Sequence, residues 1–314
     1  MKKGVTIYVL VIMGLLLCSL PVGEALDNDD VMGNNSISFT CGNLQTAINA
    51  APAGTSANPT IINVTGTCSG NVVIDQKKNN ITLNGGGTAT IHGVDVNKHT
   101  VQVMGRGITI KGFAITGGSD GIVVVRGGTA VIDGNNIHNT QNNGISVGQV
   151  SHADIINNTI QNNPNHGISV NENSSAHIGF VSYSDTTAKR NIIQGNGNQG
   201  IQVQRSASAT IVKNTIRNNI SNGIHVTRAS HADISGNVLN GNGDNGVKVD
   251  GNSGVNLGKP GGTTIFDLAN TTTVSNLKRG VNCDIGGYAD GLLGTLKGAQ
   301  GDALFDTSCI DNLQ

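Results

Sequence analysis

Apolar and polar residues alternate in short stretches along most of the chain. Ile168 and Val170 flank a serine, and Ala176 and Ile178 flank a histidine. Alternation with a period of two over three or four residues predicts short strands that bury one face. Asn and Gly stand between these stretches and predict tight turns.

The stretches recur at a fixed interval. The glycine of the pattern G-[IV]-x-[VC] recurs at spacings of 23, 23, 33, 23, 23 and 34 residues, at Gly121, Gly144, Gly167, Gly200, Gly223, Gly246 and Gly280. A column of asparagine follows the same intervals at Asn135, Asn158, Asn191, Asn214 and Asn237. The two longer intervals predict loops inserted at one corner of the repeat, in "GFVSYSDTTAKR" and in "GKPGGTTIFDLANTTT".

Equivalent positions carry the same kind of residue in successive repeats. One column consists of Ala130, Ala153, Ala176, Ala209 and Ala232, and another of Ile132, Ile155, Ile178, Ile211, Ile234 and Leu257. Stacked small and β-branched residues predict an all-β fold, a parallel β-solenoid. We expect Asn at the corner because it tolerates the left-handed conformation and because its amide can bond to the amide one repeat away.

The two ends of the chain lack the regular repeat. Leu44, Ala47, Ile48 and Ala51 have helical spacing and predict a short helix that covers the N-terminal end of the solenoid. The predicted organisation is an N-terminal segment with a helical cap over residues 26–70, solenoid coils over 71–283 and a C-terminal cap over 284–314.

Residues 1–25 are predicted to be a signal peptide. Two lysines precede an apolar run, and Gly23 and Ala25 supply the small residues that a signal peptidase needs. The alternative is a lipoprotein anchored through Cys18, although the bulky Leu17 disfavours it. The apolar run is short for a membrane span, so we expect no span in the mature chain.

The remaining composition narrows the class of protein. A net charge of −1 gives no electrostatic footprint for nucleic acid, and aromatic residues make up only 3%, which disfavours a deep cleft for neutral sugars. Four cysteines remain after the signal peptide, and three pairings are open. The economical one is local, Cys41 with Cys68 and Cys283 with Cys309. Disulfides predict a secreted, periplasmic or cell-surface protein.

Several stretches resemble the right-handed parallel β-helix proteins of the pectate-lyase-like group. They are the opening "LQTAINAAPAG", the stretch "ITLNGGGTATIHG" and coils of the type "NNTIQNNPNHGISV". The resemblance covers nearly all of the mature chain and implies this fold. The fold carries lyases, hydrolases, epimerases, esterases and adhesins, so it does not select one activity.

The catalytic motifs of that group are incomplete in this chain. Its alginate epimerases place an Asp-Pro-His-Glu quartet after an N-x-G corner, whereas Ser169, Val170 and Asn171 occupy the first three positions here and only Glu172 is retained. Pectate lyases require a cluster of acidic calcium ligands, and no outward column here stacks such residues. The cofactor is therefore unknown, with calcium an open option.

One outward column carries the groups that uronate chemistry needs. Such enzymes neutralise a carboxylate with cations and remove a proton at C5 with a base. The candidates for catalysis are Glu172, Arg205, His225 and Arg228, and Lys248 and Asp250 close by are candidates for binding. The simpler interpretation, which we favour, is a solvated face on which Glu172 neutralises Arg205.

A second outward column repeats the sequence "SHADI". His152 and Asp154 share a face, and His177 lies one coil away, so two imidazoles and one carboxylate could meet; we predict duplicated surface residues rather than a metal site. His231 and Asp233 would lie between the inserted loops, on the floor of a groove walled by Tyr183, Lys189 and Phe266. Of these, His231, Asp233 and Tyr183 are candidates for binding.

The sequence thus predicts an exported monomer that binds a polysaccharide or another cell-envelope polymer along its length, without proven catalysis. The alternative is a lyase or epimerase that acts on an acidic polysaccharide.

Overall fold

The computed structural model describes residues 35–314. The predicted signal peptide, residues 1–25, and Cys18 lie outside this range. No helix within residues 35–314 is long and apolar enough to cross a membrane.

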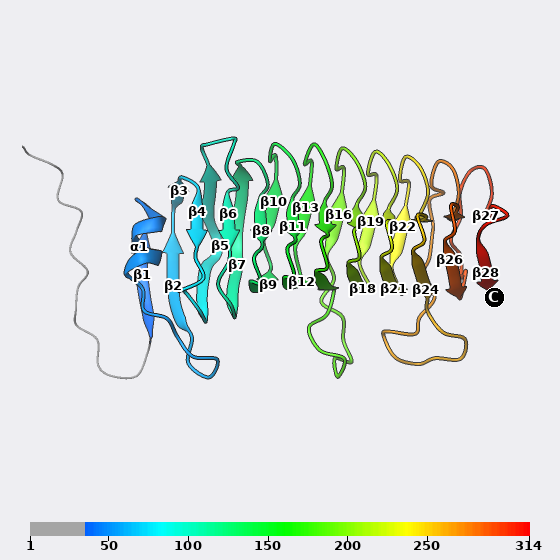
Figure 1. Ribbon diagram of the computed structural model, residues 1–314. Helices are drawn as coiled ribbons and strands as arrows, with labels where there is room; N and C mark the ends of the chain where they lie inside the picture. The colour runs from blue at the N-terminus through cyan, green and yellow to red at the C-terminus, as the bar shows by residue number, and fades with distance from the viewer. Residues whose placement is uncertain (1–34) are drawn as a thin grey trace, which may run out of the picture. The chain divides into compact units, whose positions relative to one another are not determined.

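Two parallel sheets run along the described chain, as Figure 1 shows. The narrow sheet has ten strands: β4 (Val72–Ile74), β6 (Val101–Val103), β8 (Ile122–Val124), β11 (Ile145–Val147), β14 (Ile168–Val170), β17 (Ile201–Val203), β20 (Ile224–Val226), β23 (Val247–Val249), β25 (Val281–Cys283) and β27 (Ala303–Phe305). The wide sheet has 18 strands: β1 (Ser36–Thr40), β2 (Thr60–Thr65), β3 (Thr67–Ser69), β5 (Ile81–Gly93), β7 (Ile108–Gly117), β9 (Thr129–Asp133), β10 (Asn136–His138), β12 (His152–Ile156), β13 (Thr159–Gln161), β15 (Ser175–Ile178), β16 (Ile192–Gln194), β18 (Ser208–Val212), β19 (Thr215–Arg217), β21 (His231–Ser235), β22 (Val238–Asn240), β24 (Gly254–Leu257), β26 (Tyr288–Gly291) and β28 (Ile310–Leu313).

The coils stack in the predicted register. The alanine column pairs from Ala130 through Ala153, Ala176 and Ala209 to Ala232, one residue per coil. These alanines and the neighbouring isoleucines are almost completely buried. The predicted fold class, an all-β parallel solenoid with one short helix near its N-terminus, is confirmed.

Buried asparagines form a ladder along one corner. Each side chain from Asn135 to Asn270 is linked to the next, Nδ2 to Oδ1, at 2.9–3.1 Å, through Asn158, Asn191, Asn214 and Asn237. A second ladder, at the next corner, runs through Asn163, Asn196, Asn219, Asn242 and Asn276. The stacking was expected for the first ladder, but the left-handed conformation was assigned to the wrong residue. It belongs to the preceding position, for example Lys213 (φ 58°), which turns the chain so that the next amide points into the corner.

The ends of the solenoid differ from the prediction in their extent. The helix α1 (Leu44–Ala50) forms as expected and buries Leu44 and Ile48 at the N-terminal end. However, β1 to β3 already belong to the wide sheet, and β27 and β28 extend both sheets after residue 283. The coils therefore continue beyond residues 71–283, and the segment 284–314 adds a further turn instead of only a cap. Backbone hydrogen bonds form such strands without the Gly and Asn of the repeat.

Two disulfides have the predicted local pairing. Cys41 is bonded to Cys68, with their Cα atoms 4.8 Å apart, and Cys283 to Cys309, with their Cα atoms 6.1 Å apart. Each links adjacent coils near one end of the described chain.

The two inserted loops leave the wide sheet after β15 and after β24, as the spacing predicted, and project from the same side of the solenoid in Figure 1. The coils that contain β18 and β21 lie between them.

Candidate functional site

The narrow sheet directs the middle residue of each three-residue strand outward. Ser169 on β14 pairs with Gln202 on β17, Gln202 with His225 on β20, and His225 with Lys248 on β23. The predicted outward column is therefore present, one residue per coil, at the usual inter-strand spacing of about 4.8 Å.

Two of these outward residues, His225 and Lys248, form an ionic cluster with Asp250 and Asp284, which follow β23 and β25. We call it the His225 cluster. His225 Nε2 donates to Asp250 Oδ2 at 3.0 Å. Lys248 Nζ lies 3.2 Å from Asp250 Oδ2 and 3.6 Å from Asp284 Oδ2. The side chains of His225 and Asp250 are only 14% and 12% exposed, so this pair is largely shielded from solvent.

The carboxyl group of Asp250 is held in its ionised form. Burial would raise its pKa, but hydrogen bonds from His225 and Thr227 and the contact with Lys248 outweigh it and hold the pKa far below the usual range. Asp250 therefore cannot act as a general acid; it orients His225 through Nε2. The other ring nitrogen of His225, Nδ1, is buried and has no hydrogen-bond partner among the described residues.

A second buried histidine precedes β14, two coils before the strand that carries His225. His166 precedes Gly167 and is 8% exposed. Burial, followed by the charge of His225, lowers the pKa of His166 to about 4. Its imidazole is consequently neutral at pH 7, and its Nδ1 also lacks a partner among the described residues.

Sequence reasoning did not place His166 among the candidate site residues. Its only signal is that the residue before the repeat glycine is polar in successive coils, as in Asn143, His166 and Gln199.

The predicted charged row lies apart from the His225 cluster. Arg205 Nη1 is 3.7 Å from Glu172 Oε1, and both side chains are about half exposed. Arg228 Nη1 donates to Gln204 Oε1 at 3.3 Å. No hydrogen bond or ion pair among the described residues joins Glu172, Arg205 or Arg228 to His225 or Asp250. The expected catalytic set is therefore divided into an exposed row and a half-buried cluster.

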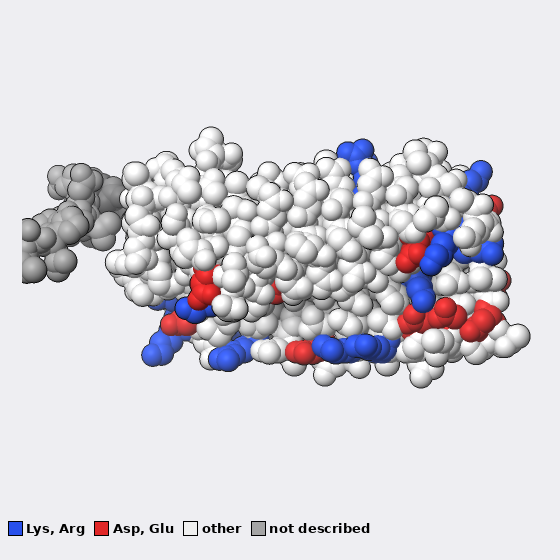
Figure 2. Space-filling model, turned by 90° about the horizontal axis from the view of Figure 1, so that it is seen from above, with Lys and Arg blue, Asp and Glu red and all other residues white. Residues whose placement is uncertain are grey.

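The exposed row continues toward the N-terminal end. Arg126, Glu172, Arg205 and Arg228 each adopt positive φ, between 54° and 58°, in the turn after a strand of the narrow sheet. Arg106 and Arg126 line a hollow of about 260 Å³ together with Gln76, Asn79 and Met104. Figure 2 shows charged side chains gathered along one long edge and toward the C-terminal end, with uncharged residues between them.

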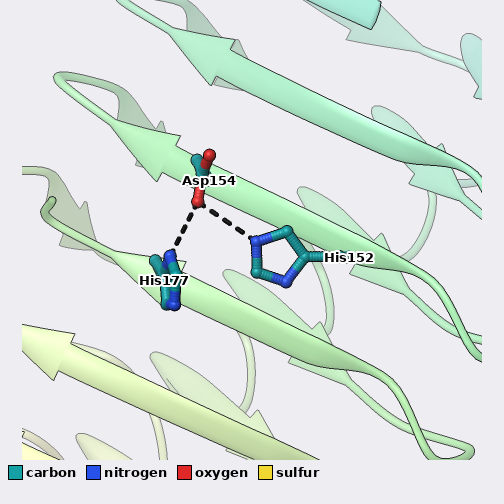
Figure 3. Close-up of side chains that lie close together, drawn as sticks. All are labelled: His152, Asp154 and His177. Carbon is teal, nitrogen blue, oxygen red and sulfur yellow. Dashed lines mark hydrogen bonds and ion pairs between the residues drawn. The ribbon is translucent and has the colours of Figure 1, made fainter. Parts of the chain in front are cut away.

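The first "SHADI" copy, on the wide sheet, brings three predicted residues together. His177 Nδ1 donates to Asp154 Oδ1 at 2.9 Å, and His152 Nε2 donates to the same oxygen at 3.2 Å (Figure 3). Burial would raise the pKa of Asp154, but these two hydrogen bonds lower it, so the carboxylate is ionised.

The second copy has a different third member. Asn256 Nδ2 donates to Asp233 Oδ1 at 2.7 Å, and His231 Nε2 donates to the same oxygen at 3.2 Å. His231 Nδ1 lies 3.0 Å from the hydroxyl of Tyr288.

The inserted loops meet beside this second copy. Phe266 of the later loop contacts Phe180 and Tyr183 of the earlier loop, with ring centroids 4.9 and 5.3 Å apart. Tyr183, Phe266 and Asp233 line a hollow of about 130 Å³, whereas Lys189 does not, contrary to the expected wall. The small hollow follows from the aromatic contacts, which bring the loops together over the plain coils.

Within residues 35–314, one group of His, Cys, Asp or Glu side chains has the geometry to hold a metal ion. It consists of His152, Asp154 and His177, whose ligand atoms all lie within 4.8 Å of one another. Two imidazoles and one carboxylate do not supply the six to eight oxygen ligands typical of calcium.

The sequence matches the family described as "Right handed beta helix region" over residues 46–178 and 99–259. A variant of the periplasmic alginate epimerase AlgG has a similar structure, with a TM-score of 0.52 and 15% identity over 89% of this chain and 84% of that chain. The A-module of a mannuronan C-5 epimerase from Azotobacter vinelandii has a TM-score of 0.46 and 13% identity, over 87% and 92%. A pectate lyase has a TM-score of 0.44 and 13% identity, over 80% and 65%. No curated protein matches the chain.

Proposed function

Since the chain belongs to the family of proteins with a right-handed β-helix region, we propose that it is an exported protein that binds an acidic polysaccharide lengthwise along its narrow sheet. The arrangement of arginines beside that sheet carries the proposal.

Four arginines form what we call the arginine edge: Arg106, Arg126, Arg205 and Arg228. Three of them, Arg106, Arg126 and Arg228, have no carboxylate within ion-pair distance among the described residues. The protein as a whole has a net charge of −1, so unpaired cations on one edge of one sheet create a local positive strip.

The spacing of the strip suits a linear polyanion. Arg106 and Arg126 lie in adjacent coils, about 4.8 Å apart, and so do Arg205 and Arg228. Each pair can therefore meet carboxylates in successive parts of one extended chain, while Gln149 and Glu172 occupy the two coils between the pairs. Arginine binds carboxylates through two parallel hydrogen bonds, which favours a uronate polymer over a neutral one. The similarly folded AlgG is described as an alginate epimerase, and alginate is a polymer of this kind.

Export is supported by two further features. The disulfides Cys41–Cys68 and Cys283–Cys309 require an oxidising compartment. The first 25 residues have the pattern of a signal peptide, and AlgG is described as periplasmic.

Affinity electrophoresis on alginate, polygalacturonate and dextran gels tests the proposal. We expect retardation on the two acidic polymers and none on dextran. The triple variant R126Q/R205Q/R228Q should lose at least tenfold in affinity, and the remaining binding should depend less on salt. The control R217Q removes an exposed arginine from β19 of the wide sheet and should bind normally. Equal loss in both variants, or equal retardation on dextran, would overturn the proposal.

A second candidate function, lysis or C5 epimerisation of the same polymer, is favoured by the His225 cluster. Lys248 can stabilise the uronate carboxylate as negative charge develops on it, and His225, which pairs with Lys248 and is oriented by Asp250 through Nε2, can accept the C5 proton at Nδ1. In a lyase the protonated imidazole then returns this proton to the leaving oxygen while the C4–O bond breaks. In an epimerase water supplies a proton to C5 from the opposite face, and the imidazole loses its proton to solvent.

Two assays separate catalysis from binding. A lyase produces unsaturated uronate, which absorbs in the ultraviolet, and an epimerase incorporates deuterium at C5 in heavy water, which NMR detects. Activity that is lost in H225Q, but not in H138Q on β10, would support catalysis at the His225 cluster. Absence of product and of deuterium on polymers that the chain binds would exclude it.

A further inference from the structure

We propose that His152, Asp154 and His177 form a binding site for a divalent transition-metal ion of the zinc type, on the wide sheet and independent of polysaccharide binding. The three side chains are shown in Figure 3.

The strand register brings the three ligands together. His152 and Asp154 occupy alternate positions of β12 and therefore share its outward face. His177 on β15 pairs directly with Asp154 in the neighbouring coil. Both parts of the site thus lie on rigid, fully paired strands, which hold ligands more closely than loops do.

The distances suit a small ion. Asp154 Oδ1 lies 3.2 Å from His152 Nε2 and 2.9 Å from His177 Nδ1. Ligands that each lie about 2.0–2.2 Å from a tetrahedral ion are separated from one another by roughly 3–4 Å. The carboxylate and both imidazoles therefore need only small side-chain rotations to coordinate one ion between them.

The second nitrogen of His152 is already anchored. Nδ1 lies 2.8 Å from Ser175 Oγ, the residue that pairs with His152 on β15. A serine hydroxyl can donate or accept, so it supports His152 whether Nε2 carries a proton or a metal ion. Metal-binding histidines commonly have such an outer hydrogen bond on the second ring nitrogen.

Aromatic rings of the first inserted loop enclose one side of the site. The ring of Phe180, which is completely buried, lies 4.5 Å from that of His177, and the ring of Tyr183 lies 5.4 Å from it. The side chains of His152, Asp154 and His177 remain 34%, 15% and 23% exposed. An ion held here would be shielded on one side and would keep a fourth coordination position open to water.

The ligand types select the class of metal. Imidazole suits zinc, copper, nickel and cobalt, whereas calcium and magnesium require predominantly oxygen ligands. We therefore expect binding of Zn²⁺ and Co²⁺ and no comparable binding of Ca²⁺.

The repeat provides a matched variant. In the second copy, Asn256 occupies the position of His177 and bonds to Asp233 within the same coil geometry. The substitution H177N therefore removes a ligand while it installs a residue that this coil accommodates elsewhere.

The test uses the mature chain without a polyhistidine tag. Isothermal titration with Zn²⁺ should give one site in the wild type and at least tenfold weaker binding in H177N. The control H138N, which removes a histidine from β10, should bind as the wild type does. Co²⁺ should give the visible absorption of a tetrahedral site in the wild type and not in H177N. Zinc should also raise the melting temperature of the wild type more than that of H177N.

Unchanged zinc affinity in H177N would overturn the proposal, as would the absence of a zinc site in the wild type. Circular dichroism of H177N identifies any loss that results from misfolding. In that event D154N, which preserves side-chain size, replaces it, and wild-type affinity in D154N would overturn the proposal.

Discussion

Asn256 donates to Asp233 across adjacent coils in the same register in which His177 donates to Asp154. Each copy of the motif thus brings a histidine, an aspartate and a third side chain together. The third side chain is His177 in the first copy and Asn256 in the second.

Replacing Asn256 with histidine should create a second metal site. His231 and Asp233 are already in place, and the hydroxyl of Tyr288 occupies the supporting role on His231 Nδ1 that Ser175 has on His152. We expect N256H to bind two equivalents of Zn²⁺ by isothermal titration. The double variant N256H/H177N should return to one. A stoichiometry of one in N256H would show that the register alone does not make the site.

His166 should make the stability of the fold depend on pH. Its pKa is lowered to about 4, whereas an unfolded histidine titrates near 6.5, so between these values only the unfolded chain takes up the proton. The free energy of unfolding is therefore not reduced by this residue above about pH 6.5. It falls on acidification toward pH 4, by up to about 3 kcal/mol. Urea unfolding should show a shallower decline in H166Q than in the wild type. H138Q should retain the wild-type slope; an equal slope in H166Q would contradict this origin.

The first asparagine ladder should be intolerant of apolar replacement. Asn214 donates to the carbonyl of Ile178 and to Asn237, and its Oδ1 accepts from Asn191. Removing it leaves buried polar groups in both neighbouring coils without partners, each at about 1–3 kcal/mol. We expect N214A to lower the free energy of unfolding by about 2–5 kcal/mol. N136A, at an exposed position on β10, should change it by less than about 0.5 kcal/mol in the same urea titration.

Phe266 should restrain the earlier inserted loop. Its ring contacts Phe180 and Tyr183, and the same loop carries Lys189 and Arg190. F266A should therefore increase the rate of tryptic cleavage after these basic residues several-fold, while the urea midpoint of the solenoid stays the same. V274A, an exposed residue that lies after the later loop, serves as the control. An unchanged cleavage rate would mean that the aromatic contact does not hold the loop.

The constant spacing of the repeat predicted the core because each coil contributes one residue to each stacked column. Ala153 and Ala176 had to pair once the spacing of 23 was recognised, and the positions of the inserted loops followed from the same count. The disulfide pairing was predicted separately, as the local one of three possibilities. The strands after residue 283 were missed because they carry no repeat glycine.

The candidate sites were less predictable because they depend on side-chain direction. The sequence placed Glu172 and Arg228 near His225, but both lie exposed in turns after their strands and bond to Arg205 and Gln204 instead. His166 was overlooked because burial, rather than residue type, sets its pKa. His152, Asp154 and His177 were correctly grouped, since register alone determines their neighbours.

The contact between Phe266 and Tyr183 joins loops that start three coils apart, after β15 and after β24. An added or deleted coil between them would shift one ring relative to the other by about 4.8 Å and separate or crowd them. Coil duplication, the easiest way for a solenoid to change its length, is therefore compatible with the loop contact before β15 and after β24 but not between them. The two loops fix the coil number of the segment they enclose, so homologues that retain both aromatic loops should differ in length only outside it.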